Sequence, residues 1–246
     1  MKLSGSVAVV TGGGQGIGAA VARALAGAGA AVVVAARTKD RIDTVAAAIN
    51  KSGGTAKAVR CDVTDPASVE ELVKAAGPVD ILVNNAGVAY SAPLAKTTLE
   101  DWDRVLAVNA TGTFLCTRAF IPGMLERKRG AIVNVASVAG LEGARYIAAY
   151  AAAKHAVIGF TRSVAAELEG TGVVCNAVCP GYVDTEMTKE SVARVSAKTG
   201  KEPEAALAAM LAASEQQRLI TPEEVAEAVR KLCSLTGRPN GVIERV

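Results

Sequence analysis

A glycine-rich turn near the start of the chain constrains its fold more than any other feature. An apolar run at residues 7–11 leads directly into the turn, and a helical pattern over residues 16–28 follows. Glycines there let the main chain approach a pyrophosphate without a Cβ in the way, and the helix N-terminus offers N–H groups to the anion. This glycine loop, residues 11–18, predicts dinucleotide binding, with a turn that holds no ligand as the alternative. Its sequence is Thr11, Gly12, Gly13, Gly14, Gln15, Gly16, Ile17 and Gly18.

Short β-branched runs alternate with alanine-rich amphipathic stretches along the chain. We expect strands at 7–11, 31–36, 56–61, 81–84, 131–136 and 173–178, and helices at 16–28, 39–51, 66–76, 99–126, 150–169 and 222–232. The strands are nearly continuous apolar runs, which is typical of strands buried on both faces of a parallel sheet. The order predicts the α/β class, with a single doubly wound parallel sheet and helices on both faces, in one domain spanning residues 1–246.

One segment interrupts this alternation. Residues 182–221, here called the lid, separate Pro180-Gly181 from the last clear helix and contain a helical stretch at 203–213. A long insertion in a compact α/β domain is usually a binding loop or a mobile cover. Because it follows the strand at 173–178, it should lie beyond the carboxyl ends of the strands, where open α/β sheets bind ligands.

The end of the second strand indicates which dinucleotide binds. NAD sites usually carry an acidic residue there, which accepts the ribose hydroxyl. Here the strand ends in Ala36 and Arg37 follows. A guanidinium forks onto a phosphate, so the sequence favours NADP(H) over NAD(H), with a solvated Arg37 and an indifferent enzyme as the alternative.

Composition limits the partners. A formal net charge of +3 is too small to indicate nucleic acid or an anionic membrane, and aromatic residues at 3% leave little for stacking bases. A single His disfavours a zinc centre, so we expect no metal. The five scattered Cys and the absence of a long, purely apolar run predict cytoplasmic residence, with no membrane contact.

Taken in order, the motifs resemble those of the short-chain dehydrogenase/reductase family, from about residue 2 to 232. The resemblance rests on Thr11-Gly-x-x-x-Gly16-x-Gly18, Asp62-Val63, Asn84-Asn85-Ala86-Gly87, Asn109, Ser137, Tyr150-x-x-x-Lys154 and Pro180-Gly181. It implies a Rossmann-type domain that uses a nicotinamide coenzyme and assembles as a homotetramer or dimer.

The resemblance also implies the coenzyme contacts. Those expected along the phosphates and the first ribose are Gly12, Gly14, Gln15, Gly16, Ile17, Gly18 and Arg37. Asp62 and Val63 would meet the adenine. The nicotinamide half would lie against Asn85, Ala86, Gly87, Pro180, Gly181, Val183 and Thr185, together with Tyr150 and Lys154.

Tyr150 and Lys154 are four residues apart on an expected helix, so they share a face. A free Tyr has a pKa of about 10, and an ammonium about 4–5 Å away could lower it toward neutrality. Tyr150 would then give a proton to a carbonyl oxygen as hydride arrives at the carbon. The resemblance implies that Ser137 holds that oxygen and that Asn109 fixes a water leading to Lys154. Taken singly, each of these residues would be assigned to packing, capping or solvation.

The stretch 144–187 is similar to 3-oxoacyl reductases and polyketide ketoreductases, which implies a ketone substrate, first of all a 3-oxoacyl thioester. Relatives that act on carrier-bound chains use cations near the pocket, and Arg127, Lys128 and Arg129 would serve for an acyl carrier protein. A second expected cation is missing, because residues 169–172 read Glu-Gly-Thr-Gly. Coenzyme A thioesters and free ketones therefore stay open.

The chain end departs from the family, since the usual Asp-Gly-Gly tail is absent, although residues 242–246 can form a last strand. The helices 99–126 and 150–169 are expected to offer a dimerising face. We interpret His155 as a packing residue and Trp102 as a core or interface residue.

Two other functions remain at this stage. One is an NAD-linked alcohol, diol or steroid dehydrogenase that works toward oxidation. The other, of a different class, is a cofactor-sensing regulator without turnover, although such proteins usually lose the Tyr, Lys or Ser that this chain keeps.

Overall fold

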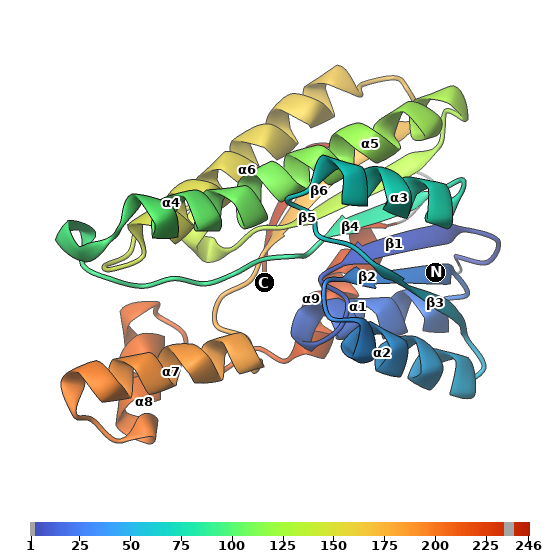
Figure 1. The fold of residues 1–246 in the computed structure, drawn as a ribbon. Helices are drawn as coiled ribbons and strands as arrows, with labels where there is room; N and C mark the ends of the chain where they lie inside the picture. Colours follow the sequence, from blue (N-terminus) through green and yellow to red (C-terminus); the bar gives the residue numbers. More distant parts are fainter. Residues whose placement is uncertain (1–2, 234–238) are drawn as a thin grey trace.

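Seven parallel strands form one sheet in the order β3-β2-β1-β4-β5-β6-β7 (Figure 1). In this computed structural model, residues 3–233 and 239–246 are described. The strands are β1 Val7–Thr11, β2 Ala31–Ala36, β3 Thr55–Arg60, β4 Ile81–Asn84, β5 Gly130–Val135, β6 Val173–Cys179 and β7 Ile243–Arg245. The predicted fold class, a doubly wound Rossmann-type sheet, is confirmed.

Helices cover both faces of the sheet (Figure 1). One layer holds α1 Gly16–Gly27, α2 Lys39–Lys51 and α9 Pro222–Leu232, and the other holds α3 Pro66–Ala76, α4 Leu99–Leu106, α5 Gly112–Glu126 and α6 Ala148–Glu167. Because successive strand residues face opposite ways, Val10 packs under the first layer and Val9 under the second. Both valines are fully buried, which explains why the strands lack polar alternation.

The predicted elements lie within one residue of the observed ones, except at three places. The predicted helix 99–126 contains a π-helical turn, Ala107–Thr111, with Asn109 inside it. The predicted helix 150–169 begins and ends two residues earlier, and Gly170 and Gly172 follow it with positive φ angles. The lid contains the predicted helix α8 Pro203–Ala213 and also α7 Glu186–Thr199, which was not predicted.

The stretch Leu99–Glu126 is long and apolar enough to cross a membrane by length and composition alone. Here it packs against the protein itself: Phe120 and Met124 belong to the core beneath the sheet, and Val105 packs against Ala149 and Ala153 of α6. The same test is passed by helices that cover a sheet, so it is weak evidence for a membrane span.

The strand order opens a crevice beside the glycine loop. β1 pairs with β2 on one side and with β4 on the other, so the chain leaves the two strands β1 and β4 in opposite directions. Ligands bind at this switch point in doubly wound sheets. The lid helices α7 and α8 lie beyond the same edge of the sheet (Figure 1).

Candidate active site

A cleft of about 1180 Å³ extends from the glycine loop to the lid helices. All the residues predicted from the sequence as catalytic or cofactor-binding line it. They are Gly12, Gly14, Gln15, Gly16, Ile17, Gly18, Arg37, Asp62, Val63, Asn85, Ala86, Gly87, Asn109, Ser137, Tyr150, Lys154, Pro180, Gly181, Val183 and Thr185. Residues from six loops therefore meet at one edge of the sheet, as parallel strands require.

The glycine loop has the shape of a cradle that a Cβ would fill. Gly12 has φ +64°, and a Cβ built there would lie 2.8 Å from Ala86 Cα. A Cβ on Gly18 would lie 2.3 Å from the carbonyl oxygen of Gly12. The N-cap of α1, Gln15, makes no side-chain hydrogen bond to the helix, so the N–H groups of the first turn have no side-chain cap. An anion fits such a helix end.

Asn85 and Thr11 hold the loop after β4 against the glycine loop. Asn85 Nδ2 donates to the carbonyl oxygens of Thr11 and Gly12 at 3.0 and 3.2 Å. The Thr11 hydroxyl accepts the N–H groups of Asn85 and Ala86 at 3.0 and 3.1 Å. The two walls of the crevice are thus joined by four hydrogen bonds and keep a fixed spacing.

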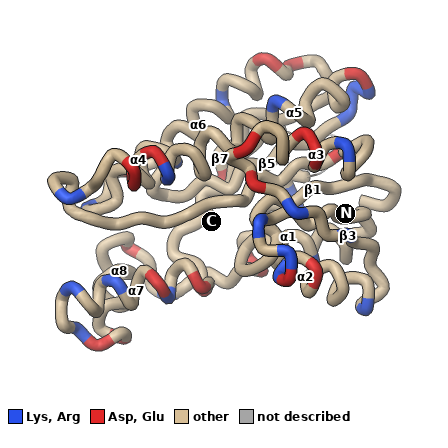
Figure 2. The backbone as a smooth tube through the Cα atoms, viewed as in Figure 1, with Lys and Arg blue, Asp and Glu red and all other residues tan. Residues whose placement is uncertain are grey.

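The end of the cleft at β2 and β3 is basic. Arg37 and Arg41 both line it, and Figure 2 shows basic residues where the chain enters α2. Arg41 Nη1 donates to Gln15 Oε1 of the glycine loop. Within the described part of the chain, neither arginine forms an ion pair with a carboxylate. Sequence reasoning missed Arg41, although its position four residues after Arg37, in the first turn of α2, was a usable signal.

Asp62 lies at the same end and is oriented by Thr64. The Thr64 N–H and hydroxyl donate to Asp62 Oδ1 at 3.0 and 2.8 Å. Burial acts to raise the pKa of Asp62, but these hydrogen bonds and the nearby Arg37 and Arg60 outweigh it, so the pKa is lowered. Asp62 is therefore a carboxylate that can accept a hydrogen bond from a ligand's amino group.

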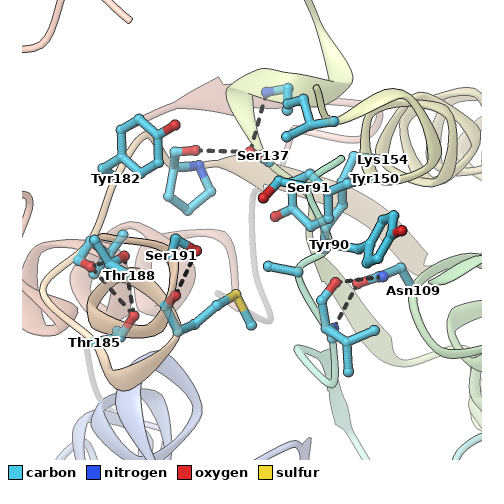
Figure 3. Close-up of a pocket in the computed structure, with 18 of the residues that line it drawn as sticks. Tyr90, Ser91, Asn109, Ser137, Tyr150, Lys154, Tyr182, Thr185, Thr188 and Ser191 are labelled. Carbon is cyan, nitrogen blue, oxygen red and sulfur yellow. Dashed lines mark hydrogen bonds between the residues drawn. The ribbon is translucent and has the colours of Figure 1, made fainter. Parts of the chain in front are cut away.

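Ser137, Tyr150 and Lys154 meet at the middle of the cleft (Figure 3). Ser137 lies two residues after β5 and is buried, and its hydroxyl accepts the Ala139 N–H at 3.2 Å. The half-buried Tyr150 has a raised pKa: desolvation is the main cause, and a hydrogen bond with Ser137 partly opposes it. The phenol therefore holds its proton at neutral pH.

Lys154 does not lower the pKa of Tyr150 as the sequence reasoning expected. Its Nζ donates to the carbonyl oxygen of Val135 at 2.8 Å and lies 5.7 Å from the centre of the Tyr150 ring. Lys154 is only 5% exposed, and burial lowers its pKa to about 8. An ammonium that is turned toward a carbonyl stabilises a phenolate less than one close to the phenolate oxygen. The prediction that Lys154 lowers the pKa of Tyr150 is therefore wrong for the protein side chains by themselves.

Asn109 supports the wall opposite the lid. Its amide donates to the carbonyl oxygens of Val88 and Val105 at 3.0 and 2.9 Å and accepts the Val88 N–H at 3.2 Å. A Cβ on Gly87 would lie 2.7 Å from Asn109 Oδ1. The hydrogen bonds of the Asn109 side chain thus all go to the backbone. Of its predicted role, which is to fix a water, only the position in the cleft is matched by the structure.

The lid is fastened at its base by Gln216, which sequence reasoning also missed. The Gln216 side chain accepts the Tyr182 N–H at 2.8 Å and donates to the Tyr182 carbonyl at 2.7 Å. Thr188 Oγ1 donates to the Val183 carbonyl at 2.6 Å. Thr185, Thr188 and Ser191 thereby face the catalytic side chains across the cleft (Figure 3). No sequence signal marks Gln216, because the pairing depends on the path of the lid.

Two interpretations of surface residues are wrong. The run 127–129 does not line the cleft: Arg127 donates to the Val79 carbonyl at 2.6 Å, and Arg129 pairs with Asp80 at 3.3 Å, both residues just before β4. These cations serve the opposite edge of the sheet. His155 is exposed rather than packed, and its Nδ1 lies 2.9 Å from the Ala151 carbonyl.

Comparison with known proteins finds dehydrogenases and reductases. The family model described as short chain dehydrogenase matches residues 6–196. The 3-oxoacyl-[acyl-carrier-protein] reductase of Synechocystis sp. is 42% identical over 192 residues, which is 76% of this chain and 78% of that protein. The meso-2,3-butanediol dehydrogenase of Serratia marcescens is 39% identical over 192 residues, 76% of this chain and 75% of that protein.

Among solved structures, a variant of actinorhodin polyketide ketoreductase with NADPH superposes with a TM-score of 0.93 at 37% identity. The match covers 100% of this chain and 97% of the other. The similarity extends across the sheet, both helical layers and the lid.

Proposed function

The chain belongs to the short-chain dehydrogenase/reductase family, and on that basis we propose that it reduces a ketone to a secondary alcohol with NADPH. One observation carries the proposal: Ser137, Tyr150 and Lys154 lie in the same cleft as the glycine cradle. Polar groups of this kind, next to a dinucleotide site, suit proton delivery to a carbonyl oxygen.

The coenzyme is NADP(H). Its pyrophosphate would lie on Gly12 and the first turn of α1, and its 2′-phosphate between Arg37 and Arg41. Two guanidinium groups without a carboxylate partner favour a phosphate over the bare ribose hydroxyls of NAD(H). Asp62 and Val63 would hold the adenine, and Val183 and Thr185 the nicotinamide amide. Bound NADPH supplies the hydride for the carbonyl carbon.

Tyr150 donates the proton, and its raised pKa fits the reductive direction because the phenol stays protonated. The Ser137 hydroxyl donates a hydrogen bond to the same carbonyl oxygen. Lys154 holds the coenzyme ribose and, when charged, stabilises the phenolate that remains. Asn109, at the π-helical turn, would fix the water that returns a proton to Lys154.

The first-choice substrate is a 3-oxoacyl thioester or a polyketide-like ketone, enclosed by the lid at 182–221. This choice is supported by the length of the lid and by the reductase relatives. Because the run 127–129 lies away from the cleft, an acyl carrier protein would have to dock elsewhere, and coenzyme A thioesters and free ketones stay open.

We further propose cytoplasmic residence and a homotetramer or dimer formed through α4, α5 and α6. Phe114 is 41% exposed on α5, in edge-to-face contact with Phe160 of α6. Cys61, Cys116, Cys175 and Cys179 are buried and form no disulfide, which suits a reducing compartment.

The deciding experiment is a panel of ketones, diketones and 3-oxoacyl thioesters assayed for NADPH consumption, with NADH beside it. Tyr150→Phe is the blank, because it removes the proton and leaves the ring. We expect at least one ketone to be reduced by the wild type and not by this variant. Equal rates with NADH would refute the coenzyme assignment, and full activity of Tyr150→Phe would refute the proton donor.

A further inference from the structure

The lid half of the cleft contains three cations that no carboxylate neutralises. Arg145 precedes α6, and Arg194 and Lys198 lie one turn apart on α7; all three line the cleft. Among residues 3–233 and 239–246, no ion pair includes any of them. The coenzyme would occupy the glycine loop and the basic end at α2, so these cations remain for the substrate.

Arg194 has an unmet hydrogen-bond donor. Its Nη2 donates to Ser191 Oγ at 3.0 Å, but its Nε is buried and has no partner. A buried donor that stays unsatisfied costs about 1–3 kcal/mol, and more when the group is charged. Ser191 lies on the face of α7 that looks toward Tyr150 (Figure 3), so the guanidinium is held beside the substrate space.

Lys198 and Arg145 border the same opening. Lys198 Nζ donates to the Ser91 carbonyl at 3.3 Å and so connects α7 to the loop after β4. The next residue of that loop, Ala92, donates its N–H to the Tyr146 carbonyl at 2.8 Å, beside Arg145. The two contacts connect Lys198 and the backbone beside Arg145 to the same loop, and both cations line the same cleft as Arg194.

The acidic residues nearby do not cancel this charge. Glu142 pairs with Arg245 at 3.1 Å, and Glu186 pairs with Lys189 at 3.8 Å. Glu190, one turn before Arg194, is exposed and does not line the cleft. Figure 2 shows acidic and basic residues along α7. Of these, Glu186, Arg194 and Lys198 line the cleft, and Glu186 is paired with Lys189.

We propose that Arg194, with Lys198 and Arg145 beside it, binds an anionic group of the substrate, so that the preferred ketone carries a phosphate, sulfonate or carboxylate beyond its carbonyl. The inference rests on the proposed ketone reduction and adds the substrate class. A guanidinium can donate through its Nη groups to two oxygens of such an anion.

The test compares ketones of equal length that end in a carboxylate, a sulfonate or the methyl ester of the carboxylate, with a coenzyme A thioester to represent the phosphate-bearing case. For Arg194→Gln we expect the ratio of kcat/KM between anionic and ester ketones to fall about tenfold or more, mainly through KM. Arg194→Lys should recover part of the ratio. Added salt should raise KM for the anionic ketones only.

Lys201→Gln is the matched control, since it removes one positive charge just after the same helix, at an exposed side chain that does not line the cleft and has no ion pair among the described residues. We expect it to leave the ratio unchanged. Thermal stabilisation by the anionic alcohol product, measured without turnover, should be reduced in Arg194→Gln alone.

The outcomes separate the two proposals. If the wild type reduces none of the ketones, the proposed function fails. If it reduces them but shows no preference for the anionic members, or if Arg194→Gln lowers both members equally, only the anion site is refuted. Which anion is favoured, carboxylate, sulfonate or the phosphate-bearing thioester, identifies the source of the charge.

Discussion

Replacing Lys154 with methionine should stabilise the fold near neutral pH while it abolishes reduction. Burial lowers the pKa of Lys154 from 10.5 to about 8, so folding disfavours the ammonium form. At 1.36 kcal/mol per pKa unit, this corresponds to about 3 kcal/mol at low pH. The variant also loses the hydrogen bond from Nζ to the Val135 carbonyl, which offsets about 1 kcal/mol of this gain in stability. We therefore expect the variant to be more stable by about 2 kcal/mol.

The stability advantage of the methionine variant over the wild type should decrease as the pH rises. Below about pH 8, Lys154 is charged in both the folded and the unfolded chain, and the cost is fully present. Between about pH 8 and 10.5, the unfolded chain binds more protons than the folded one, so wild-type stability rises with pH. The methionine variant has no such group, and its advantage should shrink across this window.

Urea unfolding at several pH values measures the free energies, and NADPH consumption measures the activity. Lys201→Met is the control, because Lys201 is an exposed loop residue and should change neither quantity. The reasoning would be refuted if the methionine variant were less stable than the wild type near neutral pH, or if its advantage did not decline as the pH rises.

Three further predictions test the remaining parts of the site. Gly18→Ala should lose at least about 2 kcal/mol of stability and weaken NADPH binding, because its Cβ would lie 2.3 Å from the Gly12 carbonyl oxygen. Gly27→Ala in the same helix, whose Cβ would meet nothing within 4 Å, should be neutral or slightly stabilising. Denaturation and coenzyme titration compare the two variants. Arg37→Ala combined with Arg41→Ala should lower kcat/KM for NADPH about a hundredfold and leave NADH nearly unaffected, which steady-state kinetics with both coenzymes would measure. Gln216→Ala should raise KM for the ketone by a larger factor than the Kd for NADPH, because it frees the base of the lid; an equal loss of both would contradict this role.

The sheet and its two helical layers were predictable because burial leaves a direct record in sequence. Val9 and Val10 face opposite layers, so both must be apolar, and runs of this kind identify the inner strands. The same logic fails for α7, where only Thr188 is buried and Ser, Thr and charged residues dominate. The π-helical turn at Asn109 was missed because the apolar pattern continues through it and the extra residue leaves no signature.

The meeting of Ser137 with Tyr150 and Lys154 was predictable from topology, since parallel strands end at one edge and residues four apart share a helical face. The direction of the Tyr150 pKa was not. Two residues at helical spacing do not reveal that the ammonium points to the Val135 carbonyl, or that burial acts on both groups. The missed residues Arg41 and Gln216 contact segments distant in sequence, Gln15 and Tyr182.

The division between a buried catalytic half and a loosely buried lid explains where specificity can change. Within residues 182–221, only Val183, Thr188, Ala206 and Met210 are buried, so a substitution elsewhere in the lid disturbs little of the core. Segments with few buried contacts open at low free-energy cost, which suits admission of a substrate. Ser137 and Lys154, by contrast, are buried, and Lys154 is held to β5 by its hydrogen bond to the Val135 carbonyl. The proton donor is therefore fixed by the fold, while the charge that selects the ketone lies on Arg194, in a helix that tolerates exchange.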